Sequence, residues 1–250
     1  MNHPDTHHSL GWETIWRSST IPGRYQSFAE PETTVTEWAE TLCPGAFILD
    51  LGCGIGRHAT YLGASGFRMA GLDISPTGIQ RAHAACAERG IAFEARVSDM
   101  KSIPWPDETF DAALSTATMH HQLRTDEALT VAEVWRVLKP GGSFLVDLPC
   151  TLTFDYQLLR DLVNAGQIAE VEPNTFLDQR AQPADIDGYL LHHYSDETDV
   201  RDLLGRFELS QLRAAVHARK PEEGGGLTGK WVAWAHKHRK TMPTARVHVI

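Results

Sequence analysis

The sequence has few cysteines and no long apolar run. Its 250 residues include 4 cysteines. They share no spacing typical of a metal or redox site, and Cys53 lies inside a glycine-rich stretch where a disulfide would be awkward. Reduced thiols, as found in the cytoplasm, are the simplest interpretation. No stretch approaches the apolar length of a membrane span, and no basic start with an apolar stretch marks a secretory signal. We therefore expect a cytoplasmic protein that does not contact a membrane.

Basic residues are scarce relative to acidic ones. The chain has 23 Lys and Arg against 32 Asp and Glu, and its formal net charge is −9. A nucleic-acid substrate requires a basic surface for its phosphates, so we expect no nucleic-acid partner. The one dense basic run, residues 237–240, lies next to the C-terminus and is interpreted as a solvated tail.

The most informative stretch is residues 47–56, which read FILDLGCGIG. Its first five residues are a short apolar run, typical of a strand that is buried on both faces. Three glycines then allow the chain to turn sharply and the backbone to approach a bulky ligand. They are Gly52, Gly54 and Gly56.

The elements expected next place a nucleoside at this turn. A helix over residues 56–65 points its first N–H groups at the ligand, and a strand over residues 67–73 ends in Asp73, which can accept hydrogen bonds from a ribose diol. A dinucleotide fingerprint would need a small residue where Arg57 stands, which disfavours an NAD-dependent oxidoreductase. Asp50, just before the turn, suits the ammonium of an amino acid better than a pyrophosphate.

Further segments follow in a characteristic order. Residues 95–100 end a third strand with an acid, and residues 103–111 read IPWPDETFD. Residues 134–142 read VWRVLKPGG, a helix end, a proline stop and a glycine turn before a fifth strand. With the first glycine turn, these segments resemble class I S-adenosylmethionine (SAM) methyltransferases, in particular the small-molecule branch. The resemblance covers residues 45–150 closely and the remainder loosely.

The resemblance implies the cofactor and the residues that bind it. SAM is the expected cofactor, and S-adenosyl-L-homocysteine (SAH) is the expected product. In the resembled family the acid at Asp99 meets the adenine amino group, and the backbone of Met100 meets the ring. The expected cofactor-binding residues of the core are Asp50, Gly52, Cys53, Gly54, Gly56, Asp73, Ile74, Asp99, Met100 and Ser115.

The resemblance also implies the fold. We expect a single α/β domain with a Rossmann-like, doubly wound sheet of seven strands, mostly parallel with one antiparallel strand near the C-terminus, and a helical N-terminal cap. Residues 1–10, polar and rich in histidine, are expected to be disordered. The expected parts are a tail and helical cap (1–40), a SAM-binding core (41–150), a lid or substrate insertion (151–193), a C-terminal helix and strand pair (194–237) and a tail (238–250).

The segment over residues 11–42 has an unusual number of aromatic residues for a region before a cofactor-binding core. They are Trp12, Trp16, Tyr25, Phe28 and Trp38. They either pack the segment onto the core or cover the pocket for SAM and substrate, and both interpretations can hold for different residues. Three residues of this segment are candidates to meet the SAM carboxylate or an anionic substrate: Arg17, Arg24 and Tyr25.

Two histidine pairs are further candidates: His120-His121 and His192-His193. Adjacent histidines in a strand point to opposite faces, and no carboxylate or cysteine lies beside them at ligand spacing, so we expect no metal site. His121 matches a family position near the methyl donor. His121 or His120 is therefore a candidate base, because imidazole titrates near neutrality. A histidine bonded to the backbone of a loop is the alternative for His121.

The expected reaction is transfer of the sulfonium methyl group to an O, N or S atom of a small molecule by in-line displacement, in a monomer or homodimer. The methyl group is already activated, so the site mainly aligns the acceptor in a dry pocket. A hydroxyl or ammonium acceptor also needs a base. Two alternatives stay open: an RNA or protein methyltransferase, and a SAM-binding protein without transferase activity.

Overall fold

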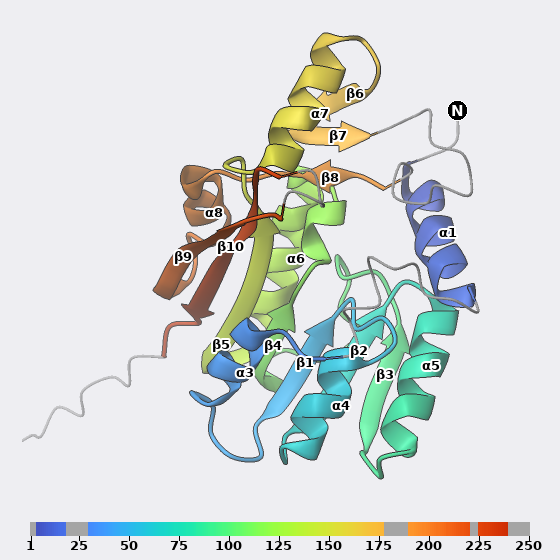
Figure 1. Ribbon diagram of the computed structural model, residues 1–250. Helices are drawn as coiled ribbons and strands as arrows, with labels where there is room; N and C mark the ends of the chain where they lie inside the picture. Colours follow the sequence, from blue (N-terminus) through green and yellow to red (C-terminus); the bar gives the residue numbers. More distant parts are fainter. Residues whose placement is uncertain (1–3, 19–29, 178–189, 221–224, 240–250) are drawn as a thin grey trace, which may run out of the picture.

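The fold is built on one seven-stranded sheet (Figure 1). The computed structural model describes residues 4–18, 30–177, 190–220 and 225–239. The strands of this sheet are β1 (Phe47–Leu51), β2 (Arg68–Asp73), β3 (Phe93–Val97), β4 (Phe110–Ser115), β5 (Leu138–Pro149), β9 (Glu208–Ala218) and β10 (Leu227–His236). Their order across the sheet is β3-β2-β1-β4-β5-β10-β9.

Five neighbouring strands run parallel. β1 pairs in parallel with β2 and β4, β2 with β3, and β4 with β5. β10 pairs antiparallel with both β5 and β9, so among the described strands of this sheet it is the one that runs in the opposite direction. The predicted α/β fold, with a mostly parallel seven-stranded sheet and one antiparallel strand near the C-terminus, is confirmed.

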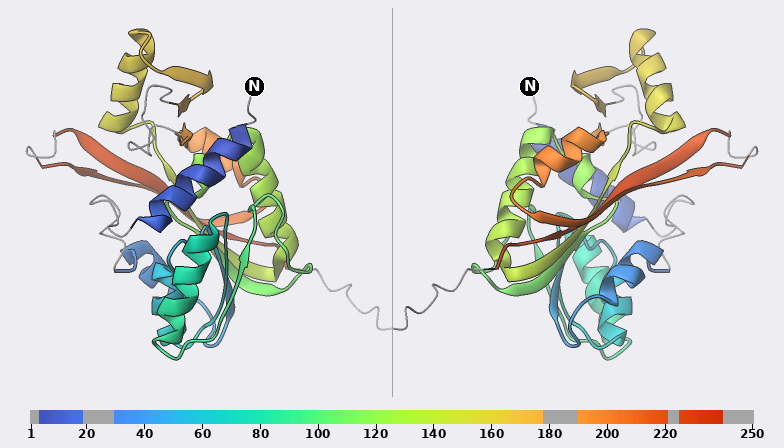
Figure 2. Two further views of the ribbon diagram at one scale, coloured as in Figure 1. Left: turned by 90° about the vertical axis from the view of Figure 1, so that its right-hand side faces the viewer. Right: turned by 90° about the vertical axis from the view of Figure 1, so that its left-hand side faces the viewer.

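Helices cover both faces of the sheet (Figure 2). One face is covered by α3 (Thr33–Ala39), α4 (Arg57–Ala64) and α5 (Pro76–Ala87), and the other by α6 (Arg124–Val137) and α8 (Glu197–Leu203). The side chains of β1 show why both faces are covered. Ile48 packs with Trp38 and Leu62 in one apolar cluster, whereas Leu49 packs with Val131 in the other. Alternate side chains of a strand point to opposite faces, so β1 contributes to two cores.

The N-terminal cap is helical from its first described residue. α1 spans Pro4–Arg17, so the expectation that residues 1–10 are disordered is wrong for residues 4–10. A proline at the start of a helix suits its first turn, where an N–H would lack a partner. Glu13 of α1 accepts hydrogen bonds from Thr77 N at 3.1 Å and from the hydroxyls of Ser75 and Thr77 at 2.5 and 2.6 Å. These bonds fix α1 to the N-terminal end of α5 (Figures 1 and 2).

The residues inserted after β5 form a small layer of their own beyond the main sheet, at the top of Figure 1. Its elements are α7 (Phe154–Asn164), β6 (Ala169–Glu172), β7 (Thr175–Leu177) and β8 (His192–His193), with the strand order β6-β7-β8. Ile168, Phe176 and Tyr194 form its own apolar cluster. Residues 178–189 of the expected insertion lie outside the described residues.

Asp196 is the N-cap of α8: its Oδ1 accepts a hydrogen bond from Asp199 N at 2.9 Å, and Asp199 Oδ2 accepts one from Asp196 N at 3.2 Å. This reciprocal pair satisfies two N–H groups at once. Ser195 instead continues the pairing with β5, because its N–H donates to Pro149 O at 2.9 Å.

The state of the cysteines and the question of a membrane-spanning helix also concern the fold. All four cysteines are free, and burial raises the pKa of the Cys86 thiol to about 11, which keeps this thiol protonated. Among the residues described, no helix has the length and apolar character that crossing a bilayer requires.

Candidate active site

A cleft lies at the carboxyl ends of the parallel strands. Its walls come from the loops after β1, β2, β3 and β4 and from α1. Ligands of open α/β sheets bind at this edge. Seven of the predicted cofactor-binding residues line it: Gly52, Cys53, Gly54, Asp73, Ile74, Asp99 and Met100. The structure thus brings these residues together, and their contacts with a cofactor stay a prediction.

The turn after β1 has a left-handed backbone at each of its three glycines. The angle φ is +67° at Gly52, +52° at Gly54 and +85° at Gly56, a region that L-residues rarely adopt. A Cβ at Gly54 would lie 2.9 Å from the ring of Trp16, and one at Gly52 would lie 2.1 Å from the side chain of Thr118. Gly56 does not line the cleft. A Cβ there would lie 3.1 Å from the backbone of α5, so this glycine permits close packing of α4 and α5.

Asp73 ends β2 and fixes the glycine turn. Its Oδ2 accepts a hydrogen bond from Gly54 N at 2.9 Å, and its Oδ1 accepts one from Ser75 N at 2.8 Å. Burial raises the pKa of Asp73 to about 6, against the lowering effect of these backbone hydrogen bonds. Each carboxylate oxygen retains a further lone pair. The same side chain can therefore hold the turn and accept hydrogen bonds from a diol.

Asp99 follows β3 and is held by the residue two positions on. Its Oδ1 accepts a hydrogen bond from Lys101 N at 2.8 Å. The Lys101 ammonium lies 3.6 Å from Asp99 Oδ2 and 3.0 Å from Asp126 of α6. The Asp99 side chain is 39% exposed, so it is oriented and still accessible to a ligand amino group.

Asp50 and Ser115 do not line the cleft. Asp50 is buried in β1, and its Oδ2 accepts no hydrogen bond from the described part of the chain. Burial raises the pKa of Asp50 to about 7, with the positive charge of Arg57 opposing the shift and Asp73 adding to it. Ser115 Oγ at the end of β4 is also buried without a hydrogen-bond partner among the described residues. A role for either residue at a cofactor stays a prediction.

Two tryptophans of α1 form a wall of the cleft. Trp12 and Trp16 both line it, with ring centroids 6.0 Å apart and planes 21° from parallel. Trp38 of α3 has the other expected role: it is fully buried in the core, and its indole N–H donates to Ser143 Oγ at 2.9 Å. Trp38 therefore packs the segment onto the core, whereas Trp12 and Trp16 line the cleft, and their role in covering SAM and substrate stays a prediction.

The polar candidates of the same segment are placed differently. Arg17 does not line the cleft: its guanidinium pairs with Glu13 at 2.9 Å, and its side chain is 73% exposed. Tyr25 and Arg24 lie outside the described residues. Their contact with a carboxylate stays a prediction.

A network of charges that the sequence did not predict supports the loop after β4. Lys230 of β10 pairs with Asp147 of β5 at 2.6 Å and also with Glu32, which pairs with Arg57 at 3.0 Å. Asp147 Oδ1 accepts a hydrogen bond from Ala117 N at 2.7 Å. Ala117 lines the cleft with a left-handed φ of +51°. The network thus holds a strained residue of the cleft wall in place.

The predicted bases lie beside the cleft. His120 and His121 end the one-turn helix η2 (Met119–His121) and directly precede Gln122, which lines the cleft. The ring of His121 meets the ring of Trp12, another lining residue, with centroids 5.0 Å apart. The rings of His120 and His121 are 4.0 Å apart. The expectation that these two side chains point in opposite directions is wrong, because they belong to a 3-10 turn and not to a strand.

Several lining residues were not predicted as site residues: Ile55, Arg57, Ser98, Thr116, Thr118 and Gln122. Arg57 could have been predicted as a lining residue, because it directly follows the glycine turn. For Thr118 and Gln122 only their location after β4 could have been used, because their approach to the cleft depends on the path of a loop.

Comparison with known families agrees with this geometry. Residues 49–146 match the family model described as a methyltransferase domain. This part of the chain is thus similar to a methyltransferase domain. The match begins within β1 and ends within β5, and this span contains most of the residues that line the cleft.

Curated relatives resemble the methyltransferase domain. The 2-methyl-6-phytyl-1,4-hydroquinone methyltransferase of Synechocystis sp. is 34% identical over 115 residues, which cover 45% of this chain and 35% of the relative. The fatty-acid O-methyltransferase of Mycolicibacterium smegmatis is 41% identical over 104 residues, which cover 40% of this chain and 36% of the relative. The matched stretches therefore span little more than a third of these relatives.

A solved structure resembles nearly the whole chain. It is the 1,6-didemethyltoxoflavin-N1-methyltransferase of Burkholderia thailandensis with bound 1,6-didemethyltoxoflavin and SAH. The TM-score is 0.67 at 17% sequence identity, and the match covers 95% of this chain and 92% of that one. At this identity the likeness concerns the fold of the methyltransferase domain together with its cap and insertion.

Proposed function

We propose that the chain is a SAM-dependent methyltransferase that transfers the sulfonium methyl group of SAM to an O, N or S atom of a small molecule. The cleft carries this proposal, because the glycine turn, Asp73 and Asp99 follow three parallel strands that are neighbours in the sheet. An adenine, a ribose and an amino-acid group can each find a partner along that edge.

Each part of SAM has a proposed partner. Asp73 accepts hydrogen bonds from the ribose diol, Asp99 from the adenine amino group, and Met100 lies against the ring. The glycine turn approaches the methionine part, with the carboxyl of Asp50 behind it as the counter-charge of the ammonium. The SAM carboxylate is proposed to lie near Arg57, which begins α4 and lines the cleft, because a helix N-terminus and a guanidinium both favour an anion.

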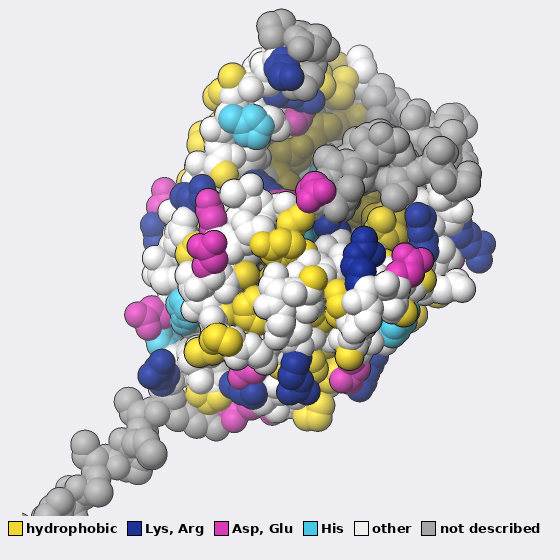
Figure 3. Space-filling view, turned by 60° about the horizontal axis from the view of Figure 1, so that its bottom comes forward, with side chains coloured by type: hydrophobic (Ala, Val, Ile, Leu, Met, Phe, Trp, Pro, Cys, Tyr) yellow, Lys and Arg dark blue, Asp and Glu magenta, His cyan; other side chains and the backbone are white. Residues whose placement is uncertain are grey.

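The acceptor is proposed to be a small and largely apolar molecule. Two relatives are named for 2-methyl-6-phytyl-1,4-hydroquinone and for fatty acids. Trp12, Trp16, Ile55 and Met100 give the cleft apolar walls. On the face in Figure 3, basic and acidic side chains of the described residues are interspersed and form no continuous basic area. Together with the net charge of −9, this distribution disfavours a nucleic acid.

The proposed reaction is a single displacement. A lone pair of the acceptor atom attacks the methyl carbon, and the C–S electron pair passes to sulfur, so the sulfonium becomes the neutral thioether of SAH. An acceptor that carried a proton on the attacking atom loses it. The tryptophan wall of α1 excludes water and helps to align the two reactants. His120 and His121, beside the cleft, are proposed to activate the acceptor.

Calorimetry and a labelled-methyl screen test this function. We expect SAM and SAH to bind and NAD not to bind, and label from SAM to enter the small-molecule fraction. Label in RNA or protein would replace the proposed acceptor class, and binding without transfer to any class would leave a SAM-binding protein. Absence of SAM binding would contradict the proposal outright.

The cellular setting is part of the same proposal. We propose a cytoplasmic enzyme that acts as a monomer or homodimer without a membrane partner. Fractionation of cells that express the full chain tests the location, and light scattering of the purified protein tests the oligomeric state.

A further inference from the structure

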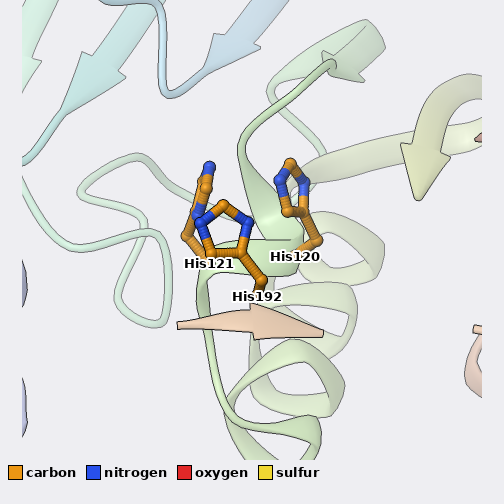
Figure 4. Close-up of side chains that lie close together, drawn as sticks. All are labelled: His120, His121 and His192. Atoms are coloured by element: carbon orange, nitrogen blue, oxygen red, sulfur yellow. The ribbon is translucent and has the colours of Figure 1, made fainter. Parts of the chain in front are cut away.

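Three histidine side chains lie close together (Figure 4). His120 and His121 come from η2 and His192 from β8, two elements that lie in contact. One ring nitrogen of each lies within 4.8 Å of the others. The ring centroids are 4.0 Å apart for His120 and His121, and 4.8 Å apart for His121 and His192. In the part of the chain that the structure describes, no other three His, Cys, Asp or Glu side chains meet in this way.

A backbone contact fixes the orientation of the central ring. His121 Nδ1 lies 2.8 Å from the carbonyl oxygen of Leu191. A carbonyl oxygen only accepts hydrogen bonds, so Nδ1 carries the proton, and Nε2 of the neutral ring presents its lone pair. Metal-ligating histidines are held in this manner, with one ring N–H donating to a carbonyl and the other nitrogen on the metal.

The neighbouring His193 shows the contrast with a structural histidine. Its Nδ1 lies 2.7 Å from Thr175 Oγ1, and its Nε2 lies 3.9 Å from the buried carboxyl of Glu127. Alternation along β8 therefore sends His192 into the cluster and His193 to the other face. The sequence argument against two ligands from one pair holds for His192-His193. It fails for His120-His121 because η2 brings both rings to one side.

We propose that His120, His121 and His192 bind a divalent transition-metal ion such as Zn²⁺. Imidazole is a preferred ligand of these ions, and three histidines with one open position form a known kind of catalytic zinc site. Zn–N bonds of about 2.0–2.1 Å in tetrahedral geometry place the nitrogens about 3.3 Å apart. Binding therefore requires rotation of the side chains to bring nitrogens that now lie within 4.8 Å of one another to that spacing. The proposal reverses the expectation that the chain has no metal site.

The site lies where a metal would serve the proposed reaction, and this role rests on the proposed function. Trp12 touches His121 and lines the cleft, and Gln122 follows His121 directly and lines the cleft as well. The open position is assigned to the O or S atom of the acceptor. The metal lowers the pKa of this group, its proton passes to water, and the resulting anion attacks the methyl carbon as described above.

Metal titration of the full chain tests the site. His3, His7 and His8 near the N-terminus can also bind metal, so a parent variant carries alanine at all three positions. After treatment with a chelator, the parent is titrated with Co²⁺, followed by visible absorption, and with Zn²⁺, followed by calorimetry. We expect one equivalent to bind in each case.

Substitutions in the parent then identify the ligands. His121→Ala and His192→Ala are each expected to weaken Zn²⁺ binding by more than about 100-fold, since even loss of an outer partner costs about 10- to 100-fold. His217→Ala, a change at an exposed histidine of β9, is the matched control and should leave it unchanged. His121→Gln, which keeps a polar side chain of similar size, provides a second variant if alanine disturbs folding.

SAM affinity, measured on the same variants, separates the two proposals. Retained SAM binding with lost Zn²⁺ binding supports the site and shows that the variants fold. Lack of saturable Zn²⁺ binding in the parent, or equal binding in the His121→Ala/His192→Ala double variant, overturns the metal site and leaves the methyltransferase proposal intact. One equivalent of Zn²⁺ without any SAM binding would reject the proposed function and retain the metal site.

Discussion

For Asp73, the structure adds two backbone contacts to the predicted role in binding the ribose of SAM. Asp73→Ala removes the acceptor of the proposed ribose bonds and also the acceptor for Gly54 N and Ser75 N. We expect SAM binding to weaken by about 1–3 kcal/mol, as for lost charge-assisted hydrogen bonds. Calorimetry measures the change. Asp107→Ala, at a carboxylate that is 74% exposed and paired with Arg136, should leave SAM affinity unaltered. Equal affinities for all three proteins would mean that the ribose lies elsewhere.

A comparison of Gly54 with Gly90 separates the effect of backbone strain from that of a steric contact in the cleft. Gly54→Ala combines an unfavourable φ of +52° with a Cβ 2.9 Å from the ring of Trp16. Gly90→Ala has a similar φ of +68°, and its Cβ would meet nothing within 4 Å. We expect both variants to lose about 1–2 kcal/mol of stability from the left-handed backbone, while the Gly54 variant alone loses SAM binding. Thermal unfolding and calorimetry give the two readouts, and retained binding in the Gly54 variant would argue against the turn as a binding element.

The same residues show how far the sequence predicts the site. The glycine turn and Asp73 were predictable because their chemistry follows from a short local pattern at the end of a strand. The contacts of Trp16 with Gly54 and of Thr118 with Gly52 were not. They join residues far apart in the chain, and no local pattern encodes where a helix docks or how a loop runs.

At the scale of elements, α1 is held to α5 by the side chains of Glu13 and Arg81, of which Arg81 donates a hydrogen bond to Trp16 O at 3.0 Å. Glu13→Ala removes its hydrogen bonds to Ser75 and Thr77 and its ion pair with Arg17. We expect faster hydrogen exchange over residues 4–17 and weaker SAM binding, because the tryptophan wall loses its anchor. Glu37→Ala removes an exposed ion pair with Arg213 and is the control. Unchanged exchange in the Glu13 variant would show that the Arg81 hydrogen bond and apolar packing hold α1 without Glu13.

Elements that a local pattern marks were predicted, and η2 was not. The apolar run of β1, followed by its glycine turn, indicated its place in the core. A one-turn helix such as η2 has three residues and no periodicity, so a strand-like geometry was assumed for His120-His121. That assumption, together with the absence of a carboxylate or cysteine at ligand spacing, led to the expectation of no metal site, and a 3-10 turn places neighbouring side chains quite differently.

At the scale of the whole molecule, the pKa values of different carboxyl groups are shifted in opposite directions. Burial raises the pKa of Asp50 to about 7 and that of Asp73 to about 6. For Glu13, hydrogen bonds from Ser75 and Thr77 outweigh burial and lower the pKa to about 2. Between about pH 4 and 7 the folded state holds more protons at Asp50 and Asp73 than the unfolded state, so these two groups reduce stability as pH rises. Glu13 contributes stability above about pH 4.5, and this contribution is lost as pH falls toward 2.

We therefore expect the protein without SAM to be most stable at mildly acidic pH. Thermal unfolding from pH 4 to 8 measures the profile. Asp50→Asn should flatten its decline toward pH 8 and raise stability there by up to about 4 kcal/mol, because the pKa of Asp50 rises from 3.8 to about 7 and each unit corresponds to about 1.4 kcal/mol. A profile identical to that of the natural chain would mean that Asp50 is ionised and stabilised in the folded protein.

The docking of α1 has a consequence for the speed of turnover. Because Trp12 and Trp16 belong to one helix, the wall that they form opens when that helix leaves α5, and each such departure breaks the bonds of Glu13. The residence time of a nucleoside in the proposed site then depends on the helix that carries the tryptophan wall. Weakening the contact between Glu13 and α5 should accelerate release of the product even where it lowers the affinity for SAM. A variant that binds SAM less well should then complete more catalytic cycles per second when SAM is saturating.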